Sequence, residues 1–427
     1  MAVDATYLIH HGGCKMSKFH LSKLACALTA LSLASLSGAA GLDRSGQASE
    51  DFSSSGTLAY ISAYQIDPDI SGKESNGDII GDLGEKYEGY GYGVKTDIND
   101  KFSVGVFYDQ PFGAAVLFEG DNSLTNINAA VDDRKKTAVD VSSDSFTGLL
   151  GVNLGVNNNF KIYGGPVLQK IEANVKINSQ SPALASVNGY DLNIAKNDAY
   201  GYMVGAAYVK PEIGLKAAIT YRSEIEHDAN YAESMPFINA VNTQLPPALR
   251  LDATQTKENE LTTPKSVNID FQTGLNPTTL LTAKARWVPW SDFSITPPLL
   301  DKNGVALNAL QGKTVDEVKL LEYDKDSYML EVGLGKRLTQ NLAVSGSIGW
   351  DSGAGNPVSP LGPTEGYYSV GLGAKYNLTP EWAVSAGAKY LMLGDAEGLL
   401  AASGTKIGEF EDNDAYLFGM KLSYAAK

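Results

Sequence analysis

The chain has 427 residues, a net charge of −15 at pH 7, two cysteines and four histidines. This strong negative charge argues against nucleic acid or another polyanion as a partner, because like charges repel across an interface. So few cysteines and histidines exclude a disulfide framework and a multi-histidine zinc site, and no metal or other cofactor is predicted.

The first forty residues are predicted to be removed. A basic stretch begins at Met16, an apolar run follows at 24–36, and small residues follow at 37–40. The run is shorter than the roughly 20 apolar residues that a membrane helix needs. Residues 1–40 are therefore interpreted as an upstream extension and a secretory signal peptide. Their removal would take away both cysteines and leave a net charge of −17.

Most of the remaining chain alternates apolar and polar side chains. In the hairpin at 367–392, Tyr368, Leu372 and Tyr376 share one face, while glycine, serine and lysine occupy the other. A strict period of two over about ten residues, with aromatic residues at both ends of the apolar face, is typical of a transmembrane β-strand. Strands of soluble β-sandwiches also alternate, but most have about five or six residues.

In chain order, this pattern predicts fourteen strands. Short turns, such as those at 99–101 and 377–381, alternate with long loops, of which 228–265 is the longest. This layout predicts an all-β fold, a transmembrane antiparallel β-barrel of about 14 strands over residues 57–427 with long extracellular loops. The strands are predicted near 58–66, 90–98, 102–118, 137–154, 160–175, 200–208, 213–221, 267–272, 281–287, 328–337, 342–350, 367–376, 382–392 and 416–424.

Charged side chains cannot face lipid, so they are predicted to line the barrel interior. Inward cations there could bind the carboxylate head group of a ligand. They could equally belong to an ordinary network of charges with Glu224, Glu226, Asp270 and Glu331. The cations in question are Lys216, Arg222, Lys284, Arg286 and Arg337.

His227 is the single histidine after residue 40 and follows the seventh predicted strand. Its place near the outer rim, beside Glu224 and Glu226, favours a surface histidine. An outer-membrane esterase, which would use this histidine as a base, is a less favoured alternative. The loop carboxylates include no isolated pair, so a glycosidase is not indicated.

The third predicted strand is interrupted by Pro111-Phe112-Gly113. Proline lacks a backbone donor and glycine permits unusual backbone angles, so this sequence predicts either a break in strand pairing or simply the end of the strand. A break within the membrane must line a cavity or be satisfied otherwise, because unpaired backbone groups in lipid cost several kcal/mol. The residues of the predicted opening are Phe107, Asp109, Pro111, Phe112 and Gly113.

Several short stretches, taken in their order and spacing, resemble the FadL-type family of outer-membrane transporters for long-chain fatty acids and other hydrophobic compounds, including toluene. The resemblance rests on Ala40-Gly41, Phe-Ser-Ser-Ser-Gly at 52–56, 64–72, 111–113, 220–225, 287–293 and 421–425. It implies a fourteen-stranded barrel with an N-terminal hatch, here reduced to residues 41–56 and lacking the family's Asn-Pro-Ala motif. It also implies lateral release of the substrate into the membrane through a kink in the third strand, which Pro111, Phe112 and Gly113 match.

The resemblance further implies that apolar loop side chains capture the substrate outside the cell. The matching positions are Met235, Phe237, Ile238, Leu245 and Leu249. The implied function is passive uptake of long-chain fatty acids, or secondarily of aromatic or alkane hydrocarbons, by a monomer in the outer membrane of a Gram-negative bacterium. Its implied partners are the hydrophobic molecule, outer-membrane lipid and the barrel-assembly machinery. A general diffusion porin and a surface adhesin remain alternatives.

Overall fold

The computed structural model of the protein describes residues 41–47, 50–120, 122–125 and 136–426. The predicted signal peptide and upstream extension, residues 1–40, lie outside this part of the chain. No helix among the described residues is long and apolar enough to span a membrane.

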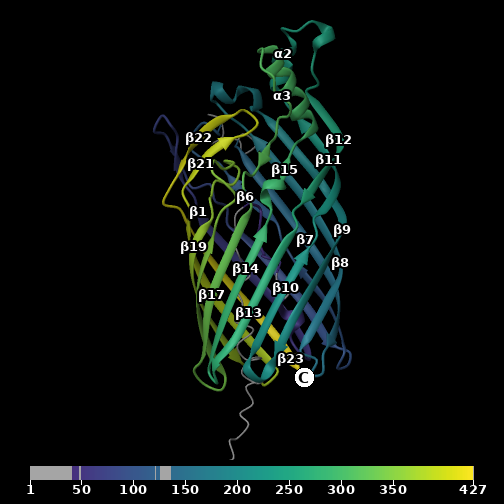
Figure 1. Ribbon diagram of the computed structural model, residues 1–427. Coiled ribbons are helices and arrows are strands. Elements are labelled where there is room, and N and C mark those ends of the chain that lie inside the picture. The colour runs from purple at the N-terminus through teal and green to yellow at the C-terminus, as the bar shows by residue number, and fades with distance from the viewer. Residues whose placement is uncertain (1–40, 48–49, 121, 126–135, 427) are drawn as a thin grey trace, which may run out of the picture.

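Fourteen antiparallel strands form a closed barrel, which confirms the predicted fold (Figure 1). The barrel closes because β1 pairs with β4 on one side and with β23 on the other. Its wall consists of β1 (Thr57–Asp69), β4 (Tyr87–Asp97), β5 (Phe102–Asp109) continued by β6 (Gly113–Leu117), β7 (Ala138–Leu154), β8 (Phe160–Ile177), β9 (Tyr190–Lys210), β10 (Leu215–Arg222) continued by β11 (Ile225–Ser234), β13 (Ser266–Asn276) preceded by β12 (Thr254–Thr263), β14 (Thr279–Val288), β17 (Ser327–Arg337), β18 (Leu342–Asp351), β19 (Tyr367–Asn377), β20 (Trp382–Leu393) and β23 (Asp414–Ala426).

The long loops gather at one end of the barrel and carry the shorter elements, while the described chain ends at the other, short-turn end (Figure 1). The helices α2 and α3 stand at the long-loop end, beyond β11 and β12. The shorter elements of the long loops are β2 (Gly72–Lys73), β3 (Ile79–Ile80), β15 (Ser294–Ile295), β16 (Leu321–Glu322), β21 (Ala396–Leu400), β22 (Thr405–Phe410), α2 (Phe237–Asn242), α3 (Pro298–Leu310) and the 3-10 turns Pro182–Val187, Pro247–Leu249 and Trp290–Asp292. Two more 3-10 turns lie elsewhere: Glu50–Ser53 precedes β1, and Pro211–Ile213 forms the short turn between β9 and β10.

The outer face of the wall carries a belt of exposed apolar side chains, as the alternation predicts. On β19, Leu372 is 71% exposed, whereas the neighbouring inward residue Ser369 is only 3% exposed. On β20, inward Lys389 is buried in the same way. A continuous apolar surface of this kind is stable only against lipid. The belt therefore marks the membrane-spanning part of the wall.

The strands from β7 to β12 continue beyond this belt. There the polarity of the two faces reverses, so that apolar side chains point inward and polar side chains point outward. On β7, Leu150 faces outward within the belt, but further along the strand Val139 and Val141 are buried and Asp140 is exposed. On β11, Glu226 faces outward in the same way. These strand ends therefore stand in water, with an apolar interior of their own.

This reversal explains two wrong strand predictions. Residues 228–265 were expected to form one loop, but β11 and β12 pair as a hairpin at the two ends of this segment, through residues 228–234 and 254–263. The loop expected to last until Asn197 is also shorter, because β9 already begins at Tyr190. In both places the outward residues are polar, so the lipid-facing pattern used for prediction does not apply.

The interior is divided into two zones. Toward the short-turn end, buried lysines point inward, as predicted: Lys95, Lys161, Lys216, Lys375 and Lys421. Toward the long-loop end, the prediction of a charged lining is wrong, because the inward residues pack into a large apolar cluster, here called the outer core. Its members include Phe112, Val116, Val141, Val175, Leu192, Tyr231, Trp290, Leu299 and Phe410.

Candidate functional site

The wall is interrupted between β4 and the strand formed by β5 and β6. Pairing between β4 and β5 stops at Tyr92 and Tyr108. Beyond this point β4 continues to pair with β1 as far as Tyr87, but β6 forms no ladder with it. Among the described residues at the break, the Tyr90 backbone N–H donates to the Gln110 side-chain oxygen at 2.9 Å. Further toward the long loops, residues 83–85 bond again with residues 115–117, through the Glu85 N–H to the Ala115 carbonyl and the Leu117 N–H to the Leu83 carbonyl. Residues 87–91 and 110–113 are here called the wall interruption.

On the other side of the break, pairing with β7 is kept. Asp109 lies opposite Ser145 and Gly113 opposite Ser142, so three residues of one strand face two of the other. The hydroxyl of Ser143 bridges this bulge. It accepts the Phe112 N–H at 2.8 Å and donates to the Phe112 carbonyl at 2.7 Å. The strand resumes after the bulge, so the alternative that it simply ends at Asp109 is wrong.

Residues 41–47, here called the N-terminal segment, lie inside the barrel against the wall interruption. The Arg44 N–H donates to the Pro111 carbonyl at 2.7 Å, and the Gly113 N–H donates to the Leu42 carbonyl at 2.8 Å. Asp43 and Phe112 form the bridge between these two bonds. The segment thus supplies, from inside, backbone partners that the neighbouring strand does not supply. This meets the requirement that backbone at membrane depth be satisfied within the protein.

A buried ion pair fixes the N-terminal segment to the opposite wall. The Asp43 carboxylate accepts a hydrogen bond from Arg286 Nε at 2.6 Å, and both side chains are at most 3% exposed. Arg286 Nη1 also donates to Asn268 Oδ1 at 2.8 Å and to the Gly46 carbonyl at 3.2 Å. A charge-assisted bond between two buried groups is strong once both charges are paired, so this contact holds the segment in place.

Arg44, the next residue, is held differently. Its guanidinium carbon lies 3.7 Å from the centre of the Tyr87 ring. Its Nε and Nη2 atoms are buried and have no hydrogen-bond partner among the described residues. Gly113 lies directly against the guanidinium, and a Cβ atom at that position would overlap it. Glycine at 113 therefore permits this close approach.

The outer core reaches the wall interruption through two aromatic side chains. Phe112 and Trp290 meet edge to face, with ring centres 6.0 Å apart, and Trp290 is fully buried. Gly41 has a positive φ of 68°, and a Cβ atom there would overlap the Trp290 ring. Sequence reasoning found the Trp290 stretch only through the family resemblance and did not single out Asp43 or Arg44.

The predicted inward cations do not form one group. Arg222 and Arg286 are buried, and Asp109 interacts electrostatically with both of them. Lys216 belongs to the lysines near the short turns, and Lys284 lies in register with Asp270 and Glu331, as the alternative of an ordinary charge network predicts. Placing Arg337 among the inner cations was wrong. It lies at a turn, where its Nη2 donates to the Pro277 carbonyl at 3.2 Å.

The predicted inward orientation of Glu224 and Glu226 is also wrong, because both side chains are exposed. Glu224 pairs on the outside with Lys265 at 3.3 Å. The reason is local: β10 ends at Arg222 and β11 begins at Ile225, and the residues between them reverse the alternation.

His227 is fully buried in β11, beyond the membrane belt, so its interpretation as a surface residue is wrong. Its Nε2 atom lies 3.0 Å from Gln169 Oε1 and its Nδ1 atom 3.2 Å from Asn197 Oδ1. Burial lowers the pKa of His227 to about 4, so the ring is neutral at pH 7. The residue is part of a buried polar network inside the outer extension of the barrel.

The predicted capture residues divide between surface and interior. Leu249 is 58% exposed, and Phe237 and Leu245 are half-buried. Met235 and Ile238 are buried in the outer core, so their prediction as surface side chains is wrong. The short helix α2 carries Ile238 on the side that packs inward.

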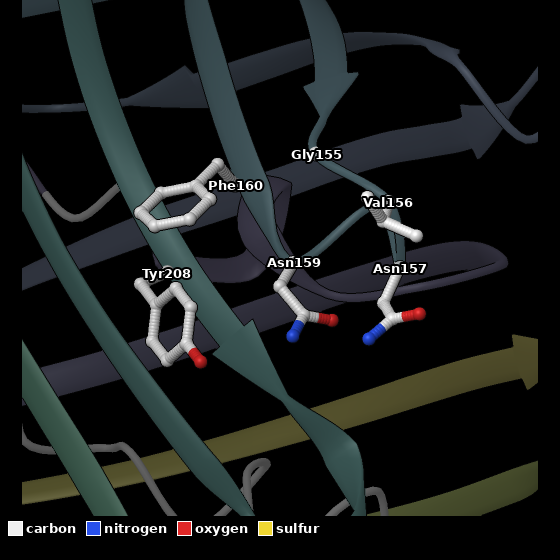
Figure 2. Close-up of a pocket in the computed structure, with 6 residues that line it drawn as sticks. All are labelled: Gly155, Val156, Asn157, Asn159, Phe160 and Tyr208. Atoms are coloured by element: carbon white, nitrogen blue, oxygen red, sulfur yellow. The ribbon is translucent and has the colours of Figure 1, made fainter.

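An open pocket occurs at the turn between β7 and β8, at the short-turn end (Figure 2). Phe160 and Tyr208 form one side of it, with ring centres 4.8 Å apart, and Phe160 is 56% exposed. Exposed aromatic pairs at this level are typical of the girdle where a barrel meets the membrane surface. The pocket is lined by Gly155, Val156, Asn157, Asn159, Phe160 and Tyr208.

Comparison with known proteins agrees with this architecture. Residues 89–425 match the family described as "Outer membrane protein transport protein (OMPP1/FadL/TodX)". No curated protein sequence matches the chain.

Solved structures share the fold at low sequence identity. A FadL homologue from Pseudomonas aeruginosa has a TM-score of 0.66 at 17% identity, covering 87% of this chain and 90% of its own. The toluene transporter TodX of Pseudomonas putida has a TM-score of 0.57 at 10% identity, with 88% and 91% covered. The toluene transporter TbuX of Ralstonia pickettii has a TM-score of 0.56 at 10% identity, with 95% and 98% covered.

The family match covers most of the chain, and the barrel is of the kind found in the outer membrane of Gram-negative bacteria. The protein is thus an outer-membrane channel for hydrophobic compounds. The chain belongs to the OMPP1/FadL/TodX family of outer-membrane transport proteins.

Proposed function

We propose that this channel takes up long-chain fatty acids passively and releases them sideways into the membrane through the wall interruption. One observation carries the proposal. The wall lacks strand pairing between residues 87–91 and 110–113, and the N-terminal segment closes the gap from inside with two backbone bonds. Separation of this segment from Pro111 and Gly113 would open a route from the interior to the lipid.

The polarity of the interior supports a sideways rather than a straight route. The outer core includes Phe112, which is part of the wall interruption, so an acyl chain would remain in apolar surroundings up to that point. Burial contributes about 0.8 kcal/mol per methylene group, so affinity needs no catalytic group. Further toward the short turns, buried charges such as Lys95 and Lys161 oppose passage of an apolar molecule.

The described residues of the predicted hatch, 41–47 and 50–56, have the contacts expected of a plug. Lys421 pairs with Asp51 at 2.8 Å, and Lys95 donates to the Gly56 carbonyl at 2.8 Å. Phe52 is fully buried against Phe107, with ring centres 6.2 Å apart. Together with the bonds of the N-terminal segment, these contacts support a hatch that is short but still blocks the interior. They favour this channel over a general diffusion porin.

The direct test is uptake of labelled oleate by a Gram-negative host that lacks its own fatty-acid transporter. Expression of this protein is expected to raise the initial uptake rate at least about tenfold above that of cells with an empty vector, because the host membrane otherwise excludes the acid. Presence of the barrel in the outer membrane is checked in the same cells. An unchanged rate with the barrel in place would contradict the fatty-acid assignment.

Aromatic or alkane hydrocarbons are the second candidate substrates. They are favoured by the apolar outer core and by the fold shared with the toluene transporters TodX and TbuX. Uptake of labelled toluene in the same host, without oleate uptake, would favour this alternative.

A further inference from the structure

The charges behind the wall interruption do not balance. Three guanidinium groups, Arg44, Arg222 and Arg286, meet two carboxylates, Asp43 and Asp109. Asp43 is paired with Arg286, and Asp109 accepts a hydrogen bond from Ser45 and interacts electrostatically with Arg222 and Arg286. This set therefore carries one positive charge more than it carries negative charges. Neither Arg44 nor Arg222 has a carboxylate at ion-pair distance among the described residues. Arg222 donates to Ser145 at 3.1 Å and interacts electrostatically with Asp109, whereas two guanidinium nitrogens of Arg44 have no hydrogen-bond partner in the part of the chain that the structure describes.

The two unpartnered atoms of Arg44 lie on one edge of its guanidinium group. Nε–H and Nη2–H point in parallel along that edge, which is the geometry that binds a carboxylate with two hydrogen bonds. Burial of such donors without partners is costly, so an anion that reaches them is bound strongly. Contact with the Tyr87 ring at 3.7 Å holds the guanidinium in one orientation before any ligand arrives.

The position of Arg44 fits an amphiphilic ligand. Its backbone is paired with Pro111 and its guanidinium lies against Gly113, so it is part of the closure of the wall interruption. Phe112, between these two residues, belongs to the outer core. A carboxylate at Arg44 would therefore leave its acyl chain against apolar side chains.

We propose that Arg44 binds the carboxylate of a fatty acid at the wall interruption, through Nε and Nη2. This inference rests on the proposed function and adds to it a reason for selecting acids over hydrocarbons. Of the cations predicted from the sequence, Arg222 and Arg286 belong to the same set of charges, but neither lies against Gly113 as Arg44 does. Arg286 already binds Asp43, and Lys216 lies toward the short turns.

The test compares two ligands that differ only in charge. Equilibrium binding of labelled oleate and of labelled methyl oleate is measured on purified protein in detergent, for the wild type, Arg44→Met and Arg44→Lys. Arg44→Met is expected to weaken oleate binding at least about tenfold, the effect of losing a charge-assisted hydrogen bond, and to change methyl oleate binding less than about twofold. Arg44→Lys keeps the charge without the planar fork and is expected to give an intermediate loss for oleate.

The control variant is Lys336→Met, which removes an exposed cation that bonds Thr278 and Thr279 at the short-turn end. It is expected to change binding of neither ligand. Unchanged oleate binding by Arg44→Met would overturn the role of Arg44, and so would an equal loss for both ligands, which would indicate a structural role. Failure of the wild type to bind oleate at all would instead overturn the fatty-acid function on which the inference rests.

Discussion

At the scale of single residues, the ion pair between Asp43 and Arg286 decides how firmly the N-terminal segment is held. Both side chains are almost completely withdrawn from solvent. Loss of one partner would leave the other charge buried and uncompensated, at a cost of about 3–5 kcal/mol. Moving the segment away from the wall would relieve that cost.

Arg286→Met is therefore expected to release the segment and open the barrel. In planar bilayers the wild type should be nearly silent if the N-terminal segment closes the interior as proposed, whereas Arg286→Met should pass a measurable ionic current. The double variant Asp43→Leu/Arg286→Met removes both charges and is the matched control, since replacement of a whole buried pair by apolar residues is often neutral. An Arg286→Met channel as silent as the wild type would contradict this account.

Residue contacts of this kind were beyond prediction from the sequence. Asp43 and Arg286 are 243 positions apart, and nothing local in either stretch indicates the other. His227 was misplaced for a related reason: it was assigned to the rim, but the strand continues beyond the membrane and buries it. Burial of a polar residue depends on what packs over it, which a strand pattern does not contain.

At the scale of elements, the wall interruption between β4 and the strand formed by β5 and β6 is the feature on which transport is proposed to depend. Pro111 and Gly113 indicated it correctly as a place where strand pairing changes, because both act on the backbone itself. The N-terminal partner that satisfies the break could not be found in this way. The outer hairpin of β11 and β12 was also missed, because its alternation runs opposite to that of a lipid-facing strand.

Gly113→Leu is expected to lower oleate uptake to the level of cells without the protein, while the barrel still folds and reaches the outer membrane. A side chain at 113 would enter the space of the Arg44 guanidinium and fill the route through the interruption. The matched control is Gly346→Leu, where a Cβ atom would meet nothing closer than 3.8 Å. Wild-type uptake by Gly113→Leu would show that substrate does not pass this point.

At the scale of the whole molecule, the barrel combines a lipid-facing belt with an apolar core beyond it. The alternating pattern sufficed to predict the closed fourteen-stranded wall, because each strand repeats the same local signal. It did not predict that the interior changes from charged to apolar along the barrel axis. Partnership with the barrel-assembly machinery and the monomeric state stay predictions.

The central claim is that the N-terminal segment must leave the wall interruption before substrate can pass. Asp43 and Phe112 face each other as a bridge pair between two backbone bonds, an arrangement with Cα atoms about 4.5 Å apart that a disulfide can span. The predicted removal of residues 1–40 leaves no cysteine in the chain, so Asp43→Cys/Phe112→Cys would contain one defined pair.

The deciding measurement is oleate uptake by this double variant before and after reduction, in the same cells. Because both states carry the same substitutions, any difference between them reports only the link between segment and wall. The account predicts uptake at background level while the disulfide is intact and a severalfold increase once a reductant has cleaved it. Equal uptake in the oxidised and reduced states would contradict the proposed route.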